Sequence, residues 1–368
     1  MSKLEQLINE LCPEGVEYIR LKECTEMKRG TSATKKTLSE GQIPVISGGK
    51  EPAFYCDTAN RYGETITIAG SGASAGYVQY WNEPIFVNDA FSIKGIKNLN
   101  TRYIYHYLLN IQEKIYDTKK GGGVPHVHIS SIENFLVPTP PLPVQEEIVR
   151  ILDKFTELTA ELTAELTARK QQYEYYRDRL FANYKSAPKK KLIEVADISR
   201  GIRVVKKQLI SNGNYPVYQN SLAPMGYYDK YNCNGNTTYV ISAGAAGEIG
   251  YCETNFWAAD DCLFFSNLRE INNKYIYYFL LTKQDFIYSN VRKASIPRLS
   301  RTVIENLQIP IISIDEQEQV VNLLNRFDKL CNDISEGLPA EIEARQKQYE
   351  YYRDKLLTFK KKEIAENE

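Results

Sequence analysis

The sequence lacks the motifs by which enzymes acting on nucleotides or nucleic acids are recognised. It has no G-x-x-x-x-G-K-[ST] loop, no G-x-G-x-x-G fingerprint, and no Asn/Asp-Pro-Pro-aromatic motif of the kind seen in amino-methyltransferases. The glycine-rich stretch 70–76 has neither the lysine nor the spacing of a phosphate loop, and glycines recur in 244–250, so we interpret both stretches as a turn between strands. We therefore expect no catalytic residue in this chain.

Paired cysteines, a net charge and long apolar runs are also missing. The seven cysteines are an odd number without a C-x-x-C spacing, which favours reduced thiols in a reducing compartment. Lys+Arg and Asp+Glu number 46 each, so no overall basic field indicates nucleic acid. No run of 18 apolar residues occurs, and no charged-then-apolar leader opens the chain. We expect a cytoplasmic protein with no membrane partner.

Histidine is scarce, which bears on metal binding. Two of the three histidines, His126 and His128, could face one side of a strand as metal ligands. No third ligand is nearby in the sequence, and residues 185–368 contain no histidine. We therefore predict no metal site.

What the sequence does contain is an internal repeat. The heptapeptide Gln-Tyr-Glu-Tyr-Tyr-Arg-Asp occurs at 172–178 and again at 348–354. Upstream of it, 145–155 aligns with 317–327 at a shift of 172, whereas the heptapeptide is shifted by 176. The second copy has thus gained four residues, about one helical turn.

The globular parts of the chain repeat as well. Gly41-Gln42-Ile43-Pro44-Val45 matches 213–217, and Tyr103-Ile104-Tyr105 matches 275–277, both at a shift of 172. Strand-like runs separated by Gly, Asn and Pro clusters, together with a helical pattern from Tyr103 to Tyr116, predict an α+β module. The chain is one unit written twice: globular module, long helix, globular module, long helix.

Apolar residues at steps of three and four predict the two long helices and a coiled-coil seam along each. Each stretch is about 40 residues, or roughly 60 Å if continuous, and we expect the copies to bury each other as an intramolecular antiparallel pair. Pro339 predicts a kink or break in the second helix. The expected seam residues are Ile148, Ile151, Phe155, Leu158, Leu162, Leu166, Tyr173, Tyr176, Leu180, Val320, Leu323, Phe327, Leu330, Ile334, Leu338, Ile342, Tyr349, Tyr352 and Leu356.

A smaller repeat lies inside the first helix, where Thr-Ala-Glu-Leu occurs at 159–162 and again at 163–166. Adding or removing four residues nearly preserves a coiled-coil seam. It changes the length of the helix by about 6 Å. The repeat is therefore a place where the helix can change length while its packing is kept.

Taken together, these features resemble the DNA-specificity subunit of type I restriction-modification systems over essentially the whole chain. The resemblance rests on the two modules, the Pro-rich entry 137–143, the Gln-Glu-Glu start at 145–147, the Thr-Ala-Glu-Leu repeats, and the Ala-Arg segments at 168–169 and 344–345 that lead into the heptapeptides. It implies two target recognition domains separated by an antiparallel intramolecular coiled coil, with a pseudo-two-fold internal repeat. The implied bounds are recognition domain 1 at 1–142, the first long helix at 143–184, recognition domain 2 at 185–314, the second long helix at 315–358, and a charged tail at 359–368.

The resemblance also implies a function. Each recognition domain would read one half of a bipartite, asymmetric site in double-stranded DNA, while the helix pair would set the gap and dock methyltransferase (modification) subunits. Restriction/translocase subunits would complete the enzyme. This chain would bind no cofactor itself, and S-adenosylmethionine, ATP and Mg would belong to the partner subunits.

Basic and amide side chains in loops at equivalent places of both modules are the candidates for DNA contact, since such groups bind phosphates and base edges. Each alone is as well explained as solvated surface. The candidates are Lys28, Arg29, Lys35, Lys36, Lys119, Lys120, Arg200, Arg203, Lys206, Lys207, Gln219, Asn220, Arg292, Lys293, Arg298 and Arg301.

Two other functions stay open at this stage. A coiled-coil scaffold that pairs two protein-binding modules would suit the balanced net charge. A stand-alone DNA-modifying enzyme with an unrecognised site would bind S-adenosylmethionine or cleave DNA as the isolated chain. Purified complexes that ignore DNA would favour the scaffold, and S-adenosylmethionine binding or DNA cleavage by the isolated chain would favour the enzyme.

Overall fold

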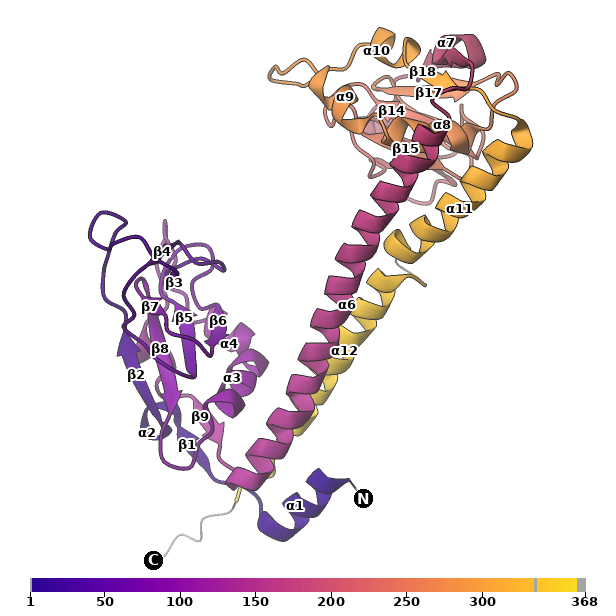
Figure 1. The fold of residues 1–368 in the computed structure, drawn as a ribbon. Coiled ribbons are helices and arrows are strands. Elements are labelled where there is room, and N and C mark those ends of the chain that lie inside the picture. The colour runs from indigo at the N-terminus through magenta and orange to yellow at the C-terminus, as the bar shows by residue number, and fades with distance from the viewer. Residues whose placement is uncertain (1, 334–335, 363–368) are drawn as a thin grey trace, which may run out of the picture. The chain divides into compact units, whose positions relative to one another are not determined.

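A computed structural model describes residues 2–333 and 336–362, and divides the chain into two compact units (Figure 1). The N-terminal unit comprises Met1–Leu162 and Ile342–Glu368, and the C-terminal unit comprises Thr163–Glu341. Helix α6 (Leu142–Asn183) and helix α12 (Leu338–Leu356) each contribute residues to both units. None of the described helices is both long and apolar enough to cross a membrane.

The N-terminal unit is built from small antiparallel sheets and short helices. A four-stranded sheet has the order β2-β8-β5-β6, a three-stranded sheet the order β4-β3-β7, and β1 pairs with β9. The elements are α1 (Lys3–Leu11), β1 (Tyr18–Arg20), α2 (Leu21–Cys24), β2 (Thr25–Arg29), β3 (Ile43–Ile46), β4 (Phe54–Cys56), β5 (Thr65–Ala69), β6 (Val78–Trp81), β7 (Phe86–Val87), β8 (Ala90–Gly95), α3 (Thr101–Asn110), α4 (Gln112–Tyr116), α5 (Ile129–Ile132) and β9 (Leu136–Pro138).

The C-terminal unit has the same topology, strand for strand. Its sheets have the orders β11-β17-β14-β15 and β13-β12-β16, and β10 pairs with β18. The elements are β10 (Lys189–Lys191), α7 (Leu192–Val195), β11 (Asp197–Arg200), a 3-10 turn η1 (Lys206–Gln208), β12 (Tyr215–Tyr218), β13 (Gly226–Tyr228), β14 (Thr237–Ile241), β15 (Ile249–Cys252), β16 (Trp257–Ala258), β17 (Cys262–Ser266), α8 (Asn273–Leu281), α9 (Gln284–Ser289), α10 (Arg301–Glu305), β18 (Gln308–Pro310) and α11 (Ile314–Asn332). The predicted α+β class and the internal repeat are confirmed.

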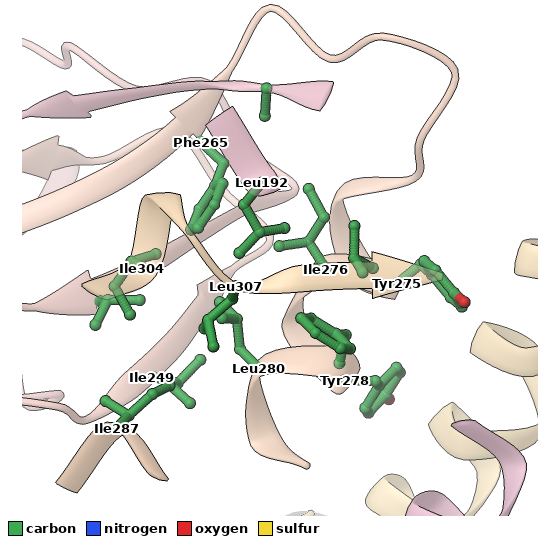
Figure 2. Close-up of a cluster of buried hydrophobic side chains, with 14 of the residues drawn as sticks. Leu192, Ile249, Phe265, Tyr275, Ile276, Tyr278, Leu280, Ile287, Ile304 and Leu307 are labelled. Carbon is green, nitrogen blue, oxygen red and sulfur yellow. The ribbon is translucent and has the colours of Figure 1, made fainter. Parts of the chain in front are cut away.

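The central strand β14 shows why each module needs two layers. All five of its residues are buried, and successive side chains of a strand point to opposite faces. Val240 packs into the large core under α8, shown in Figure 2, whereas Tyr239 and Ile241 pack with Phe256 in a separate cluster on the other face. The residues labelled in Figure 2 are Leu192, Ile249, Phe265, Tyr275, Ile276, Tyr278, Leu280, Ile287, Ile304 and Leu307.

Two helical segments pack side by side within each unit, and they run in opposite directions (Figure 1). In the N-terminal unit, the ring of Phe155 in α6 stacks on that of Tyr352 in α12, with centroids 5.4 Å apart. In the C-terminal unit, Phe327 in α11 stacks on Tyr176 in α6 at 6.0 Å. These four residues occupy equivalent positions of the repeat, so the same aromatic contact closes both helix pairs.

Burial along these helices departs in places from the predicted seam. Leu158, Tyr176, Leu323 and Leu330 are exposed over more than a third of their surface. The buried residues Leu152, Phe181, Val321, Leu324, Cys331 and Leu357 lie beside the predicted positions. The reason is that each helical segment has two neighbours, because Leu152 and Leu324 pack into the cores of the globular parts rather than against a single partner helix. Ile334 lies outside the described residues.

The second helical stretch is two helices. Helix α11 ends at Asn332 and α12 begins at Leu338, with Pro339 in its first turn, where a missing N–H costs nothing. The predicted break in the second helix is therefore confirmed, but it lies before Leu338, which is itself the first residue of α12. Of the expected tail, Phe359 accepts a hydrogen bond at its carbonyl oxygen from the Tyr18 hydroxyl (3.0 Å), and Lys361 pairs with Val16; residues 363–368 lie outside the described part of the chain.

A buried glutamine joins each globular part to the start of a helical segment. The Gln145 Oε1 accepts from the backbone N–H of Asn100 (2.8 Å), and its Nε2 donates to the carbonyls of Asn98 (3.0 Å) and Pro140 (2.7 Å). Its counterpart Gln317 makes the same three kinds of bond, to the N–H of Asn272 and to the carbonyls of Glu270 and Ile312. Both side chains are at most 1% exposed, so these bonds are made away from water.

We predict that Gln145→Leu destabilises the N-terminal unit by on the order of 1–3 kcal/mol, because it leaves the buried Pro140 carbonyl and two partly buried backbone groups without their partner. Trp81 lies in that unit and Trp257 in the other, so the fluorescence of Trp81 in a Trp257→Phe background reports its urea unfolding. The control Gln6→Leu, at an exposed position of α1 in the same unit, should change the free energy of unfolding by less than about 0.5 kcal/mol. Equal effects of the two variants would show that Gln145 does not hold the junction.

Candidate nucleic-acid interface

The four-stranded sheet of the N-terminal unit brings three chain segments to one of its ends. Arg29, the last residue of β2, pairs with Phe91, and Ala69, the last residue of β5, pairs with Ala90 at the start of β8. The loops that follow these strand ends form a hollow lined by Arg29, Gly70, Asp89, His126 and His128, among others. We call this end of the sheet, in either unit, the strand-end surface.

The C-terminal unit places the equivalent residues in the same way. Arg200, the last residue of β11, pairs with Leu263, and Ile241 at the end of β14 pairs with Cys262. Arg298 joins this end through an isolated bridge to Ala243. The strand-end surface of this unit therefore carries arginine where the other unit carries histidine, since Arg298 is the counterpart of His126.

A hairpin loop projects from each strand-end surface. Residues 120 and 126 exchange both backbone hydrogen bonds (2.9 and 2.8 Å), and residues 292 and 298 do the same (2.8 and 3.2 Å). Each loop is anchored by a glycine, because Gly72 donates to the Pro125 carbonyl (3.0 Å) and Gly244 donates to the Pro297 carbonyl (3.1 Å). Both glycines have φ of +85°, a conformation that favours glycine. The interpretation of 70–76 and 244–250 as turns between strands is thereby confirmed.

The predicted contact residues fall into several groups in the structure. Arg29 and Lys120 lie together at one strand-end surface, and Arg200, Arg292 and Arg298 lie at the other. Lys28 and Arg301 have acidic partners, Glu26 and Glu305, each at 2.6 Å. Lys35 and Lys119 lie over the rings of Phe54 and Tyr116, and Gln219 and Asn220 follow β12. Lys36, Arg203, Lys206, Lys207 and Lys293 are exposed on loops or the η1 turn.

Two apolar residues at the tips of the hairpin loops were not among the candidates. Val124 is 54% exposed and Ile296 is 55% exposed. The sequence carried one signal for them, because each precedes a proline and the two prolines align in the repeat. Periodicity could not identify these residues, since they belong to no helix or strand.

The histidine pair on the first surface does not form part of a metal-ligand cluster among the described residues. His126 and His128 stack with ring centroids 6.0 Å apart. Within 2–333 and 336–362, no three His, Cys, Asp or Glu side chains come together as a metal site would require.

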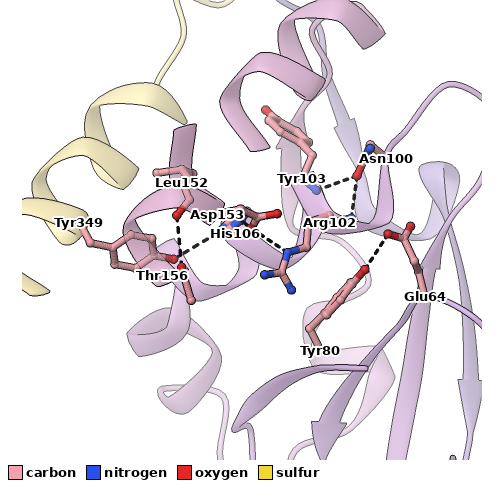
Figure 3. A network of polar contacts seen from close by, with 10 residues as sticks. All are labelled: Glu64, Tyr80, Asn100, Arg102, Tyr103, His106, Leu152, Asp153, Thr156 and Tyr349. Carbon is pink, nitrogen blue, oxygen red and sulfur yellow. Dashed lines mark hydrogen bonds and ion pairs between the residues drawn. The ribbon is translucent and has the colours of Figure 1, made fainter. Parts of the chain in front are cut away.

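A polar network around the buried His106 fixes the helix behind the N-terminal sheet to both helical segments of its unit (Figure 3). Asp153 of α6 accepts from the Arg102 Nε and lies against the His106 Nε2, each at 2.8 Å, while the His106 Nδ1 is 3.2 Å from the Tyr349 hydroxyl of α12. A neutral imidazole satisfies both neighbours, because one nitrogen donates to the carboxylate and the other accepts from the hydroxyl. The network ties α3, α6 and α12 together and so holds the sheet in place.

The equivalent junction of the C-terminal unit is neutral at the two positions that correspond to His106 and Asp153. There the Tyr278 hydroxyl donates to the Asn325 Oδ1 (2.6 Å), at the positions equivalent to His106 and Asp153. Tyr173 replaces Tyr349, and its buried hydroxyl has no hydrogen-bond partner among the described residues. The same arrangement of helices is thus held by charged side chains in one unit and by neutral side chains in the other.

The titration of the ionic junction follows from its burial. Desolvation lowers the pKa of His106, and the Asp153 carboxylate opposes this only in part. For Asp153 burial alone would raise the pKa, but the hydrogen bonds from His106 and Arg102 outweigh it, and the pKa lies below its ordinary value. His106 is therefore held neutral beside an ionised carboxylate.

Comparison with known proteins identifies the family. The model of the type I restriction modification DNA specificity domain matches residues 13–169 and again 185–344. The chain therefore belongs to this family, and it carries the domain twice.

The relatives agree with this assignment. A Haemophilus influenzae protein named as a type I restriction enzyme specificity subunit is 31% identical over 351 residues, covering 87% of this chain and 89% of that protein. The specificity subunit of the Escherichia coli type I restriction enzyme EcoR124I/EcoR124II is 28% identical over 424 residues, covering 100% and 99%. The crystal structure of the type I restriction-modification S subunit from M. genitalium shares the fold, with a TM-score of 0.68 at 19% identity over 93% of this chain and 96% of that one.

We predict that the N-terminal unit loses stability as the pH falls from about 7.5 to about 5.5. The folded pKa of His106 is below its ordinary value of about 6.5, so the unfolded chain takes up the proton first, and stability present above pH 6.5 declines below it. The measurement is the urea midpoint from Trp81 fluorescence in the Trp257→Phe background.

The matched control is the double variant His106→Tyr/Asp153→Asn, which copies the pair Tyr278 and Asn325. This variant should fold and should lose most of the dependence on pH in that window. An unchanged dependence would show that His106 is not the group responsible.

Proposed function

We propose that this chain is the subunit that selects the DNA target of a type I restriction-modification enzyme, and that each unit reads one half of a bipartite, asymmetric site. The observation that carries the proposal is that one architecture occurs twice with different side chains at its strand-end surface. Lys120 and His126 in one unit stand where Arg292 and Arg298 stand in the other. Similar modules with different contact groups suit two half-sites of different sequence.

The helical segments supply the spacing between the half-sites in this account. Helix α6 is continuous from Leu142 to Asn183 and includes both Thr-Ala-Glu-Leu units. Its length therefore depends directly on the number of these units. The N-terminal unit is completed by α12 and the C-terminal unit by the second half of α6, so a change in α6 leaves both reading surfaces intact.

The same segments offer a docking surface for methyltransferase subunits. Tyr175 is 59% exposed and Tyr351 is 61% exposed, and each lies edge-on to the next tyrosine at 5.5 and 5.4 Å. They occupy the same position of the two identical heptapeptides, one in each unit. Exposed tyrosines supply large contact area at protein interfaces. Identical exposed sequence in both units therefore suits two copies of one protein partner.

Catalysis belongs to the partner subunits in this proposal. S-adenosylmethionine, ATP and Mg would be bound there, and motor and nuclease subunits would join the complex. A coiled-coil scaffold for two protein-binding modules is the alternative, and it would leave DNA methylation unaffected.

We predict that one added Thr-Ala-Glu-Leu unit after Leu166 lengthens the gap of the methylated motif while both half-sites stay unchanged. The helix gains about 6 Å, at most about two base pairs at 3.4 Å each. Single-molecule sequencing of methylated adenine measures the gap in two host strains. Both carry the cognate methyltransferase, one with the original chain and one with the lengthened chain. A third strain lacks only this chain, and there the motif should vanish.

Two results would count against the proposal. Altered half-sites in the lengthened chain would show that α6 does more than set the spacing. Methylation that persists without the chain, while the methyltransferase is expressed, would favour the scaffold alternative.

We predict that Tyr175→Ser and Tyr351→Ser each weaken binding of one methyltransferase subunit by about 2 kcal/mol, or roughly thirtyfold. The control is Tyr62→Ser, because Tyr62 is 66% exposed but lies on the globular part. Titration by isothermal calorimetry gives the affinity and the number of subunits bound. If both heptapeptide variants bind the methyltransferase subunits as tightly as the control does, the docking surface lies elsewhere.

A further inference from the structure

The tips of the two hairpin loops share a feature that the packing of the units does not require. Val124 and Ile296 stand at equivalent positions and are both more than half exposed. A single exposed apolar residue needs no explanation. Here, however, the same position of two loops that differ at the residues before it carries a β-branched apolar side chain held in solvent.

The loops hold these side chains on a fixed base. The backbone pairing of residues 120 with 126 and 292 with 298 closes each loop, and the glycine donors Gly72 and Gly244 anchor the carbonyl of the proline after the tip. The pair of backbone hydrogen bonds at the base of each loop and the proline after the tip restrict where the tip can move. Each apolar side chain is thus presented at a defined distance from the strand-end surface.

The hairpin loops that carry the tips are themselves basic, although Asp89 lines the hollow beside the first. The segments 119–126 and 291–298 contain no Asp or Glu. Lys119 and Lys120 flank the first tip, and Arg292, Lys293 and Arg298 flank the second. Basic groups beside an exposed apolar wedge match a nucleic-acid duplex, where cations contact phosphates and apolar side chains insert at base steps or meet thymine methyl groups.

We propose that the two hairpin loops are the elements that grip the DNA half-sites, with the basic side chains on phosphates and with Val124 and Ile296 against the bases. This inference rests on the proposed function and assigns its contact residues. The loops differ in a way that suits different half-sites. A Cβ added at Gly122 or Gly123 would meet none of the described residues, so the first loop can bring its bare backbone close to the duplex, whereas the second presents Lys293 and Ser295.

The test uses the complete complex with its methyltransferase subunits, and compares Val124→Ser with Ile296→Ser. The controls are Ile96→Ser and Leu268→Ser, whose residues are 36% and 38% exposed and follow β8 and β17 at the opposite end of the same sheets. Methylated motifs are mapped in cells, affinity for a duplex carrying the wild-type motif is measured by fluorescence anisotropy, and melting temperatures are compared.

We expect each tip variant to relax or change one half of the motif, a different half for each, with roughly tenfold weaker binding and an unchanged melting temperature. The controls should retain the wild-type motif and affinity. Tip variants that behave like their controls, while the wild-type motif is bipartite, would overturn the role of the loops and leave the proposed function standing. A wild-type chain that directs no bipartite motif would overturn the proposed function itself.

Discussion

Each unit of this protein depends on a helical segment that lies outside its globular part, α12 for the N-terminal unit and the second half of α6 for the C-terminal unit. Tyr349 and Leu357 belong to the core of the N-terminal unit, and Tyr173 and Phe181 occupy the equivalent places in the C-terminal unit. A module of this size with one open apolar face cannot bury that face alone. The rest of the fold depends on the pairing of the two helix copies. In this pairing Phe155 stacks on Tyr352 and Phe327 stacks on Tyr176.

The repeated architecture does not require repeated chemistry. The same junction is held by His106 and Asp153 in one unit and by Tyr278 and Asn325 in the other. What both solutions share is a hydrogen bond between the two equivalent side chains, His106 with Asp153 and Tyr278 with Asn325, as polar groups in a core require; the buried hydroxyl of Tyr173 beside the second pair has no partner among the described residues. The buried glutamines, in contrast, are the same in both units because they bond to backbone groups. The residues whose side chains bond to backbone groups are the same in both units. The residues whose side chains bond to each other differ between the units, and both members of the pair differ together.

Much of the fold could be predicted from the sequence because it is recorded there twice. The repeat gave the module count and the helix pair, and Pro339 indicated where the second helical stretch divides. The seam was harder, because residues such as Leu152 and Leu324 face the globular cores, and a single period cannot represent a helix with two neighbours. The polar network at His106 joins residues more than 240 positions apart, and no local pattern reports such contacts.

The candidate interface was predictable only as a set of basic residues. Sequence alone could not distinguish Lys28 and Arg301, which have acidic partners, from Arg29 and Arg298, which lie at a strand end. The tips Val124 and Ile296 emerged only when backbone pairing showed that both loops are hairpins. Contact surfaces built on loops depend on long-range pairing, and that is the part of a structure that local sequence specifies least.

The central claim is that each module reads its half of the target independently, and duplication of one module tests it most directly. Residues 18–141 would be replaced by a second copy of residues 189–313, since Tyr18 and Lys189 occupy equivalent places in β1 and β10. Asp153→Asn would be added so that the incoming tyrosine equivalent to Tyr278 keeps its amide partner. The account predicts a methylated motif in which the half read by the N-terminal unit is lost and both halves become the sequence read by the C-terminal unit. Retention of the original asymmetric motif by this chain would contradict the account.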